Sequence, residues 1–207
     1  MPCYDYSRHN EIVRQYYQEY RMFQRVINMT RHIVIFFFIF ISGCASVPEG
    51  IEPVKGFEVD RYLGKWYEIV RLDHSFERGL SNVSAEYSIR DDGNLRVLNR
   101  GYNDNKKQWS DAEGVAKFLG ASDVGSLKVS FFGPFYGGYN IIELDKENYQ
   151  YAMIAGNDRS YLWILSRTPK LAPDIKSQLI DRAASLGFPV EQFIDVKHNS
   201  TQMSSDK

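Results

Sequence analysis

The sequence predicts an all-β fold: an eight-stranded antiparallel up-and-down barrel with one C-terminal α-helix packed on its outside. From residue 64 onward, short runs of alternating apolar and polar residues follow one another, with turn residues between them. The chain is rich in aromatic residues, with 14 Tyr and 13 Phe, which suits a pleated sheet better than a helical protein. After residue 167 the period of the apolar residues changes to that of a helix.

Eight candidate strands follow one another through this region. Turns rich in Asp, Asn and Gly separate several of them, at residues 91–94, 145–148 and 157–160, because these residue types tolerate unusual backbone angles. Short connections make sequential strands antiparallel neighbours, and a closed barrel of about eight strands leaves room for side chains or one small ligand. The strands are expected at residues 64–73, 82–91, 94–103, 109–119, 126–132, 138–145, 148–156 and 160–167.

The segment after the last strand predicts the helix. Pro173 suits a first helical turn, and apolar residues then recur at helical spacing until Gly187 ends the run. The one apolar face of this helix is expected to pack on the outside of the barrel. Residues 193–196 are expected to form a short closing strand, and 199–207 a loose polar tail. The predicted domain covers residues 59–198.

The charge balance and the content of histidine and cysteine narrow the functional classes. The chain carries 25 basic and 26 acidic side chains, a formal net charge of −1, so nothing suggests a nucleic-acid partner. After residue 44 there are two histidines and no cysteine, no Gly-x-Ser-x-Gly elbow and no His-Glu-x-x-His pair. We therefore expect a protein that is not an enzyme and that has no metal or cofactor. A lipid hydrolase that uses Asp or Glu is left open.

The front of the chain predicts a secretory signal. Residues 33–41 are nine consecutive apolar residues without a charge, with Arg31 before them and small residues after them. A membrane-spanning helix needs about 20 apolar residues, whereas the apolar part of a signal peptide needs about 7–15. We therefore assign residues 29–43 to a signal peptide.

Residues 1–28 fit no ordinary signal peptide, because they are polar and rich in Tyr. We interpret them as the product of a mis-called start, with Met22 or Met29 as the true one. A genuine, disordered N-terminal extension is the alternative.

The residue after the signal peptide defines its type. Ile41-Ser42-Gly43-Cys44 resembles the lipobox of bacterial lipoproteins, which implies that the thiol of Cys44 receives a diacylglyceryl anchor. Because Ala45 rather than Asp follows, the resemblance implies a protein of the outer membrane of a Gram-negative bacterium, facing the periplasm. Residues 44–58 contain two prolines and two glycines with little periodicity, which predicts a tether between lipid and domain.

Three segments carry a family resemblance. Gly64-Lys65-Trp66-Tyr67, Tyr139-Asn140-Ile141-Ile142 and Leu162-Trp163-Ile164-Leu165-Ser166-Arg167 resemble, in this order, the three conserved segments of lipocalins. The resemblance covers residues 62–196 and is strongest to the bacterial outer-membrane lipoprotein branch and to apolipoprotein D. The middle segment has Gly138-Tyr139-Asn140 where typical lipocalins have Thr-Asp-Tyr. The resemblance implies an eight-stranded calyx that binds fatty acids or lysophospholipids.

Barrel topology predicts which end is closed and which side chains face inward. Arg167 ends the last strand where Trp66 begins the first, so the guanidinium is expected to lie over the indole and, with Gly64, to form the closed end. Strand parity then gives the inner face, and small residues such as Gly114 favour a cavity there. The predicted ligand-binding residues are Ala85, Tyr87, Asn99, Phe131, Tyr139, Tyr151, Met153, Tyr161 and Trp163.

The opposite end of the barrel is the predicted mouth. It is expected to be formed by the loops at 73–81, 104–108, 133–137 and 157–159. Basic groups in these loops are candidates for holding a carboxylate or phosphate head group, namely Arg78, Lys106 and Arg159. Phe135 and Tyr136 are expected either to line the mouth or to touch the membrane surface or a second subunit.

Together these residues predict a lipid-anchored carrier of a fatty acid or lysophospholipid that serves maintenance of the cell envelope. The alternative is a scaffold lipoprotein with a filled barrel and a protein partner. A homodimer is left open.

Overall fold

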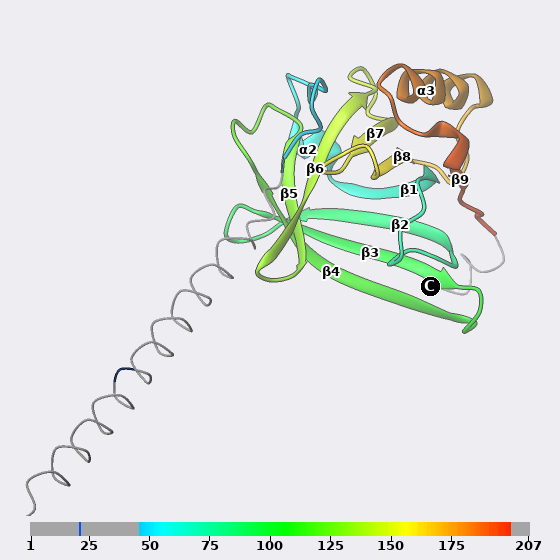
Figure 1. The fold of residues 1–207 in the computed structure, drawn as a ribbon, viewed down its shortest axis with the longest axis horizontal. Coiled ribbons are helices and arrows are strands. Elements are labelled where there is room, and N and C mark those ends of the chain that lie inside the picture. The colour runs from blue at the N-terminus through cyan, green and yellow to red at the C-terminus, as the bar shows by residue number, and fades with distance from the viewer. Residues whose placement is uncertain (1–20, 22–45, 200–207) are drawn as a thin grey trace, which may run out of the picture. The chain divides into compact units, whose positions relative to one another are not determined.

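The computed structural model describes Arg21 and residues 46–199, and Figure 1 shows the barrel in it. The predicted signal peptide, Cys44 and the tail from residue 200 onward lie outside the described residues. The described sheet has nine strands. They are β1 (Gly64–Arg71), β2 (Leu80–Ile89), β3 (Leu95–Asn103), β4 (Gln108–Phe118), β5 (Ser126–Phe132), β6 (Phe135–Leu144), β7 (Tyr151–Ala155), β8 (Leu162–Ser166) and β9 (Ile194–Asp195).

Strands β1 to β8 form the predicted antiparallel up-and-down barrel. Each strand pairs with its successor, and β1 closes the sheet because it pairs with both β8 and β2. The predicted short strand after the helix is β9. It pairs with Val70 and Arg71, beyond the stretch of β1 that pairs with β2.

Arg167 and Trp66 form the closed end, as the sequence predicts. The guanidinium carbon of Arg167 lies 3.9 Å from the centroid of the Trp66 ring. The same guanidinium donates hydrogen bonds to the backbone carbonyls of Arg61 and Leu63, at 2.7 and 2.9 Å. A short helix, α2 (Val59–Tyr62), thereby becomes part of the floor of the barrel.

The backbone at the start of β1 explains the glycine in the first motif. Gly64 has a φ of 87°, in the left-handed region that favours glycine. A side chain at this position would also face Arg167, whose Nη1 lies 3.6 Å from the place of a Cβ. Gly64 therefore allows the turn from α2 into β1 underneath the guanidinium.

Two apolar clusters lie on the two faces of the sheet. The inner cluster fills the closed half of the barrel and includes Trp66, Val97 and Leu127. The outer cluster lies under helix α3 (Pro173–Ser185), whose buried residues are Leu179 and Ala183. Figure 1 shows α3 outside the barrel on the side of β7 and β8, and a 3-10 turn, η1 (Val190–Gln192), leads from it to β9.

The predicted tether at residues 44–58 is wrong for the part that the structure describes. Val54 donates its N–H to the carbonyl of Ile141 and accepts the N–H of Gly125, both at 2.9 Å. Ile51 and Phe57 are buried. The segment lacks periodicity because it packs against the barrel as an irregular extended chain. The folded domain therefore includes residues 46–58.

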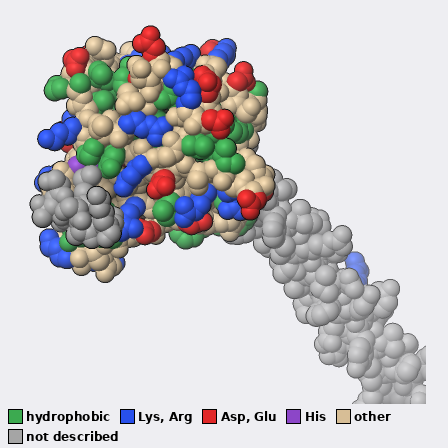
Figure 2. Space-filling model, turned by 180° about the vertical axis from the view of Figure 1, so that it is seen from behind, with side chains coloured by type: hydrophobic (Ala, Val, Ile, Leu, Met, Phe, Trp, Pro, Cys, Tyr) green, Lys and Arg blue, Asp and Glu red, His purple; other side chains and the backbone are tan. Residues whose placement is uncertain are grey.

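The surface of the domain carries charges of both signs. Figure 2 shows acidic and basic side chains interspersed on one face, with small apolar areas between them. Within the described part of the chain, no helix is long and apolar enough to span a membrane.

Candidate ligand-binding site

The inner wall of the open half of the barrel is formed by side chains from five strands. Ala85 pairs with Trp66 and with Asn99 on the neighbouring strands, so all three share the inner face. Phe131, Tyr139 and Trp163 lie on the same face. These wall residues, Ala85, Asn99, Phe131, Tyr139 and Trp163, are only partly buried although they point into the barrel. The open half is therefore accessible from the mouth.

Asn99 provides a polar group on this wall. Its side-chain oxygen is buried and accepts no hydrogen bond from the described residues. A buried acceptor without a donor is unfavourable by about 1–3 kcal/mol, so it favours a donor supplied by water or a ligand.

Three tyrosine hydroxyls meet between the wall and the floor, and we call Tyr62, Tyr87 and Tyr139 the tyrosine triad. The hydroxyl oxygen of Tyr139 lies 2.6 Å from that of Tyr62 and 2.8 Å from that of Tyr87. Burial is the main cause that raises the pKa of all three hydroxyls, so they stay neutral. Two hydrogen bonds use two of three hydroxyl hydrogens. The third remains available to an acceptor at the bottom of the site.

The prediction that Tyr151 and Met153 face the pocket is wrong. Met153 pairs with Ile164, and both belong to the outer cluster with Leu179 of α3. Tyr151 packs against the same cluster. Because α3 covers the outer face of β7, this strand is apolar on both faces, and alternation cannot distinguish its inside from its outside.

The expectation that Gly114 leaves free space is also wrong. A Cβ on Gly114 would lie 2.8 Å from Cδ1 of Phe131 and 2.7 Å from the carbonyl oxygen of Ser130. The glycine therefore admits the ring of Phe131, which occupies part of the interior beside β4.

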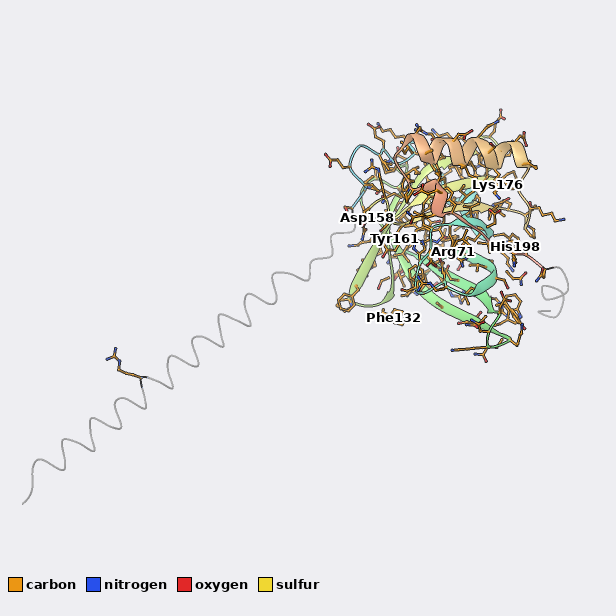
Figure 3. The ribbon with its side chains drawn as sticks, turned by 45° about the vertical axis from the view of Figure 1, so that its right-hand side comes forward. Arg71, Phe132, Asp158, Tyr161, Lys176 and His198 are labelled. Carbon is orange, nitrogen blue, oxygen red and sulfur yellow. The ribbon has the colours of Figure 1, made fainter. Side chains whose placement is uncertain are left out.

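A group of charged residues that was not among the predicted site residues lies inside the barrel near the mouth, and we call Glu68, Arg71 and Glu77 the buried charge cluster. Arg71 donates to Oε1 of Glu68 at 2.8 Å and to the backbone carbonyl of Glu77 at 3.0 Å. The indole N–H of Trp163 donates to Oε2 of Glu77 at 3.0 Å. The exposed fractions of Glu68, Arg71 and Glu77 are 3, 3 and 7 %. Figure 3 labels Arg71.

Two carboxyl groups of this cluster share one arginine. Burial and the neighbouring Glu77 raise the pKa of Glu68 well above its usual range, against the opposing effect of Arg71. Burial also raises the pKa of Glu77, while the hydrogen bond from Trp163 and the positive charge of Arg71 oppose this rise. A hydrogen bond between the carboxyls raises the pKa of Glu68 and lowers that of Glu77. The pair thus holds a proton, which burial favours most strongly on Glu68, and Arg71, which pairs directly with Glu68 at 2.8 Å, compensates the carboxylate charge that remains.

An irregularity in β1 brings Arg71 inside. Glu68 pairs with Leu165 and Val70 pairs with Ile164, so β1 contains one extra residue at this point. A bulge of one residue reverses the alternation of side chains that follows it. Glu68 and Arg71 therefore both point inward, although they are three positions apart. Glu68 has the same parity as Trp66, and that signal was available in the sequence.

The mouth above this cluster is lined by stacked rings. The ring centroid of His74 lies 4.8 Å from that of Tyr161, 4.8 Å from that of Trp163 and 5.3 Å from that of Phe76. Burial, with a further contribution from Arg71, lowers the pKa of His74 to about 4, so the ring is neutral at pH 7. Tyr161 is 37 % exposed and thus lies at the rim of the site rather than within it.

We expect Glu68→Gln to flatten the pH dependence of stability. A carboxyl with a raised folded-state pKa stabilises the fold fully below its unfolded value of 4.5, and this stabilisation is lost as the pH rises toward the folded value. Glutamine imitates the protonated acid, because it still donates to Glu77 and accepts from Arg71. In urea unfolding, the free energy of unfolding of the wild type should fall by at least about 1 kcal/mol more than that of the variant between about pH 5 and pH 8. Equal losses would contradict the assignment of the proton to Glu68.

The three residues predicted to bind a ligand head group differ in how far other groups of the protein already engage their side chains. Arg78 donates to both carboxylate oxygens of Asp73, at 3.0 and 3.3 Å. Lys106 is exposed in the turn between β3 and β4. The prediction for Arg159 is wrong: its guanidinium donates to the carbonyls of Leu186 and Glu49, at 2.7 and 2.8 Å, and so fastens the chain outside the barrel.

The unusual Gly138-Tyr139-Asn140 segment holds the beginning of the described chain, and we call Ser46, Gly138, Asn140 and Asn157 the N-terminal clamp. Asn157 Oδ1 accepts the N–H of Gly138 at 2.6 Å and that of Ser46 at 3.3 Å. The side-chain amide of Asn140 donates to the carbonyl of Ser46 at 3.0 Å. Asn157 follows β7 at the open end of the barrel, so residue 46 is fixed beside the mouth.

Comparison with known proteins gives the family of the chain. A family model described as "Lipocalin-like domain" matches residues 57–198. The chain is 52 % identical over 159 residues to "Outer membrane lipoprotein Blc" of Vibrio cholerae, covering 77 % of this chain and 93 % of that protein. It is 33 % identical over 159 residues to "Apolipoprotein D" of Mus musculus, covering 73 % of this chain and 80 % of that protein.

A solved structure supports the fold. Insecticyanin from the tobacco hornworm Manduca sexta superimposes with a TM-score of 0.59 at 20 % identity, over 76 % of this chain and 89 % of that chain. The closed barrel, the Arg167–Trp66 contact at its floor and the match over residues 57–198 lead to one conclusion. The chain is a member of the lipocalin family.

Proposed function

We propose that this protein is a carrier of a hydrophobic ligand, a fatty acid or a lysophospholipid, which it holds in the open half of the barrel. The observation that carries the proposal is the asymmetry of the interior. One end is sealed by Arg167 over Trp66, whereas five inward residues of the wall, Ala85, Asn99, Phe131, Tyr139 and Trp163, stay partly exposed. Each CH₂ group of an acyl chain that enters this interior contributes about 0.8 kcal/mol.

The wall residues and the mouth have different roles in the proposal. Ala85, Tyr87, Asn99, Phe131, Tyr139 and Trp163 contact the ligand, with Tyr161 at the rim. Lys106 and Arg78 are the remaining candidates for an anionic head group, although Arg78 must first leave Asp73.

The proposal also includes the anchor and the location. Cys44 carries the lipid, and the domain faces the periplasm from the outer membrane. The relative from Vibrio cholerae is named as an outer membrane lipoprotein, which supports this part.

A scaffold protein with a filled barrel is the second candidate. The ring of Phe131 over Gly114 favours it, because this side chain takes up interior space. Lipid extraction from the protein purified from its native membrane separates the two functions. Stoichiometric fatty acid or lysophospholipid in the extract supports the carrier, and an extract free of both supports the scaffold.

We expect Trp163→Ala to weaken binding of a fluorescent fatty acid by about tenfold, because it removes a large apolar surface from the inner wall. Arg78→Ala is the comparison, since it removes an exposed head-group candidate that is already paired with Asp73, and its effect should stay within about threefold. Trp163→Phe keeps most of the apolar contact and should lie between the two. Equal affinities of Trp163→Ala and wild type in the titration would contradict the ligand site.

A further inference from the structure

The exposed aromatic residues of the domain gather at one end of the barrel. Phe132 and Phe135 flank the turn between β5 and β6 and are 80 and 62 % exposed, and Phe76 in the loop after β1 is 62 % exposed. All three lie at the open end of the barrel. At the closed end, the large exposed apolar residues of the described chain are aliphatic: Ile89 and Leu119.

Phe132 and Phe135 form one small apolar tip. They are paired with each other across the hairpin, on either side of Gly133 and Pro134. Figure 3 labels Phe132 at the edge of the domain, on the outside of this hairpin. We call Phe132 and Phe135 the aromatic tip.

The chain that leads to Cys44 reaches the domain beside this tip. Ser46 is held in the N-terminal clamp by Asn157 and Asn140. Gly138 of the clamp is three residues from Phe135 along β6, about 10 Å of strand. Cys44 precedes Ser46 by two residues in the sequence, and two residues of chain span at most about 7 Å.

From this juxtaposition we propose that the aromatic tip is a membrane-docking element, which inserts its two Phe rings into the surface of a lipid bilayer with the mouth of the barrel facing the lipid. This inference deepens the proposed carrier function, because a mouth against the bilayer receives its ligand without passage through water. Phe76, in the loop between β1 and β2, is a further exposed ring at the open end.

A lipid surface fits the aromatic tip better than a second copy of the chain. Two Phe side chains provide about 300–500 Å² of apolar surface, whereas a stable interface between proteins needs about 800 Å² from each partner. Insertion into a bilayer needs no complementary partner surface, since exposed Phe rings beside a lipid anchor provide the apolar area themselves. The lipid anchor would also raise the effective concentration of the aromatic tip at the membrane, so even a weak second contact would add to the attachment of the domain.

The experiment tests docking without the anchor. The full chain with Cys44→Ser is mixed with phosphatidylcholine vesicles, which carry no net charge, and the bound fraction is measured by flotation. Phe132→Ser together with Phe135→Ser should weaken vesicle binding by at least about tenfold. Ile89→Ser, which replaces an apolar residue that is 52 % exposed at the closed end, is the control and should change vesicle binding by less than about twofold.

A second readout reports orientation. In the chain with Cys3→Ser and Cys44→Ser, an environment-sensitive dye is attached to Phe132→Cys or to Asp92→Cys in a turn at the closed end. Vesicles should brighten and blue-shift the dye at position 132 and leave that at 92 unchanged. Equal responses at both positions, or vesicle binding that the double Phe variant keeps, would overturn the proposal. A dimer in sedimentation that the double Phe variant abolishes, with vesicle binding unchanged, would instead assign the tip to contact between copies.

The outcome is separable from that of the carrier function. The double Phe variant leaves the inner wall intact and should titrate with a fluorescent fatty acid like the wild type. Loss of vesicle binding with normal titration supports docking. Absence of fatty-acid binding by every variant, including wild type, would overturn the carrier function while the docking result stands.

Discussion

Replacing Arg71 with alanine is expected to destabilise the domain by about 3–5 kcal/mol, because a buried carboxylate then loses its counter-ion. The pKa of Glu77 is already raised by burial, and the remaining bond from Trp163 cannot neutralise its charge. Arg71 also holds the mouth loop through the carbonyl of Glu77. Urea unfolding at neutral pH measures the effect.

An exposed arginine of the same loop serves as the control. Arg78→Ala removes an ion pair with Asp73 at the surface and should lower stability by no more than about 1 kcal/mol. The deficit of Arg71→Ala should also shrink at about pH 5, where protonation removes the uncompensated charge of Glu77. Similar deficits for the two arginines, or a deficit of Arg71→Ala that is independent of pH, would show that the buried charge cluster has no electrostatic role.

Gly138→Ala is expected to destabilise the domain by about 2–3 kcal/mol and to release the N-terminal clamp. A Cβ at this position would lie 2.5 Å from Oδ1 of Asn157 and 2.8 Å from the carbonyl oxygen of Ser46. The second atom belongs to the backbone, so it moves only if the whole segment moves. Thermal unfolding and proteolysis of the segment around Ser46 measure the two consequences.

The neighbouring glycine offers a matched control. A Cβ on Gly137 meets nothing within 4 Å, so Gly137→Ala should change stability by less than about 0.5 kcal/mol and leave proteolysis unchanged. If both variants behave alike, the close approach at residue 138 does not hold the clamp together.

Much of the fold was predictable because the barrel repeats one simple pattern. The eight strands and the helix after Pro173 lie where periodicity and turn residues put them. The contact between Trp66 and Arg167 follows from strand direction alone, because antiparallel strands return the last strand to the start of the first. Ala85 and Asn99 could be assigned to the inner face from alternation, because one face of their strands meets solvent and the other does not.

The errors occur where alternation loses its meaning. Tyr151 and Met153 belong to a strand that is covered on both faces, so an apolar side chain there does not show which face points into the barrel. Arg71 follows a bulge that reverses the alternation of inward and outward side chains, and the residue types alone do not reveal that bulge. Arg159 and residues 46–58 were misjudged because their partners are backbone carbonyls far away along the chain, such as those of Leu186 and Ile141.

The sequence by itself determined the class of fold, the order and direction of the strands, and the closed end at Trp66 and Arg167, because these depend on local periodicity and on connectivity. Only the tertiary structure decided which charges are buried and where the chain before β1 is held. Glu68, Arg71 and Glu77 meet through a bulge and a loop, and Ser46 meets Asn157 across 111 residues. Such contacts depend on how the closed sheet brings distant backbone together, and no spacing along the chain encodes them.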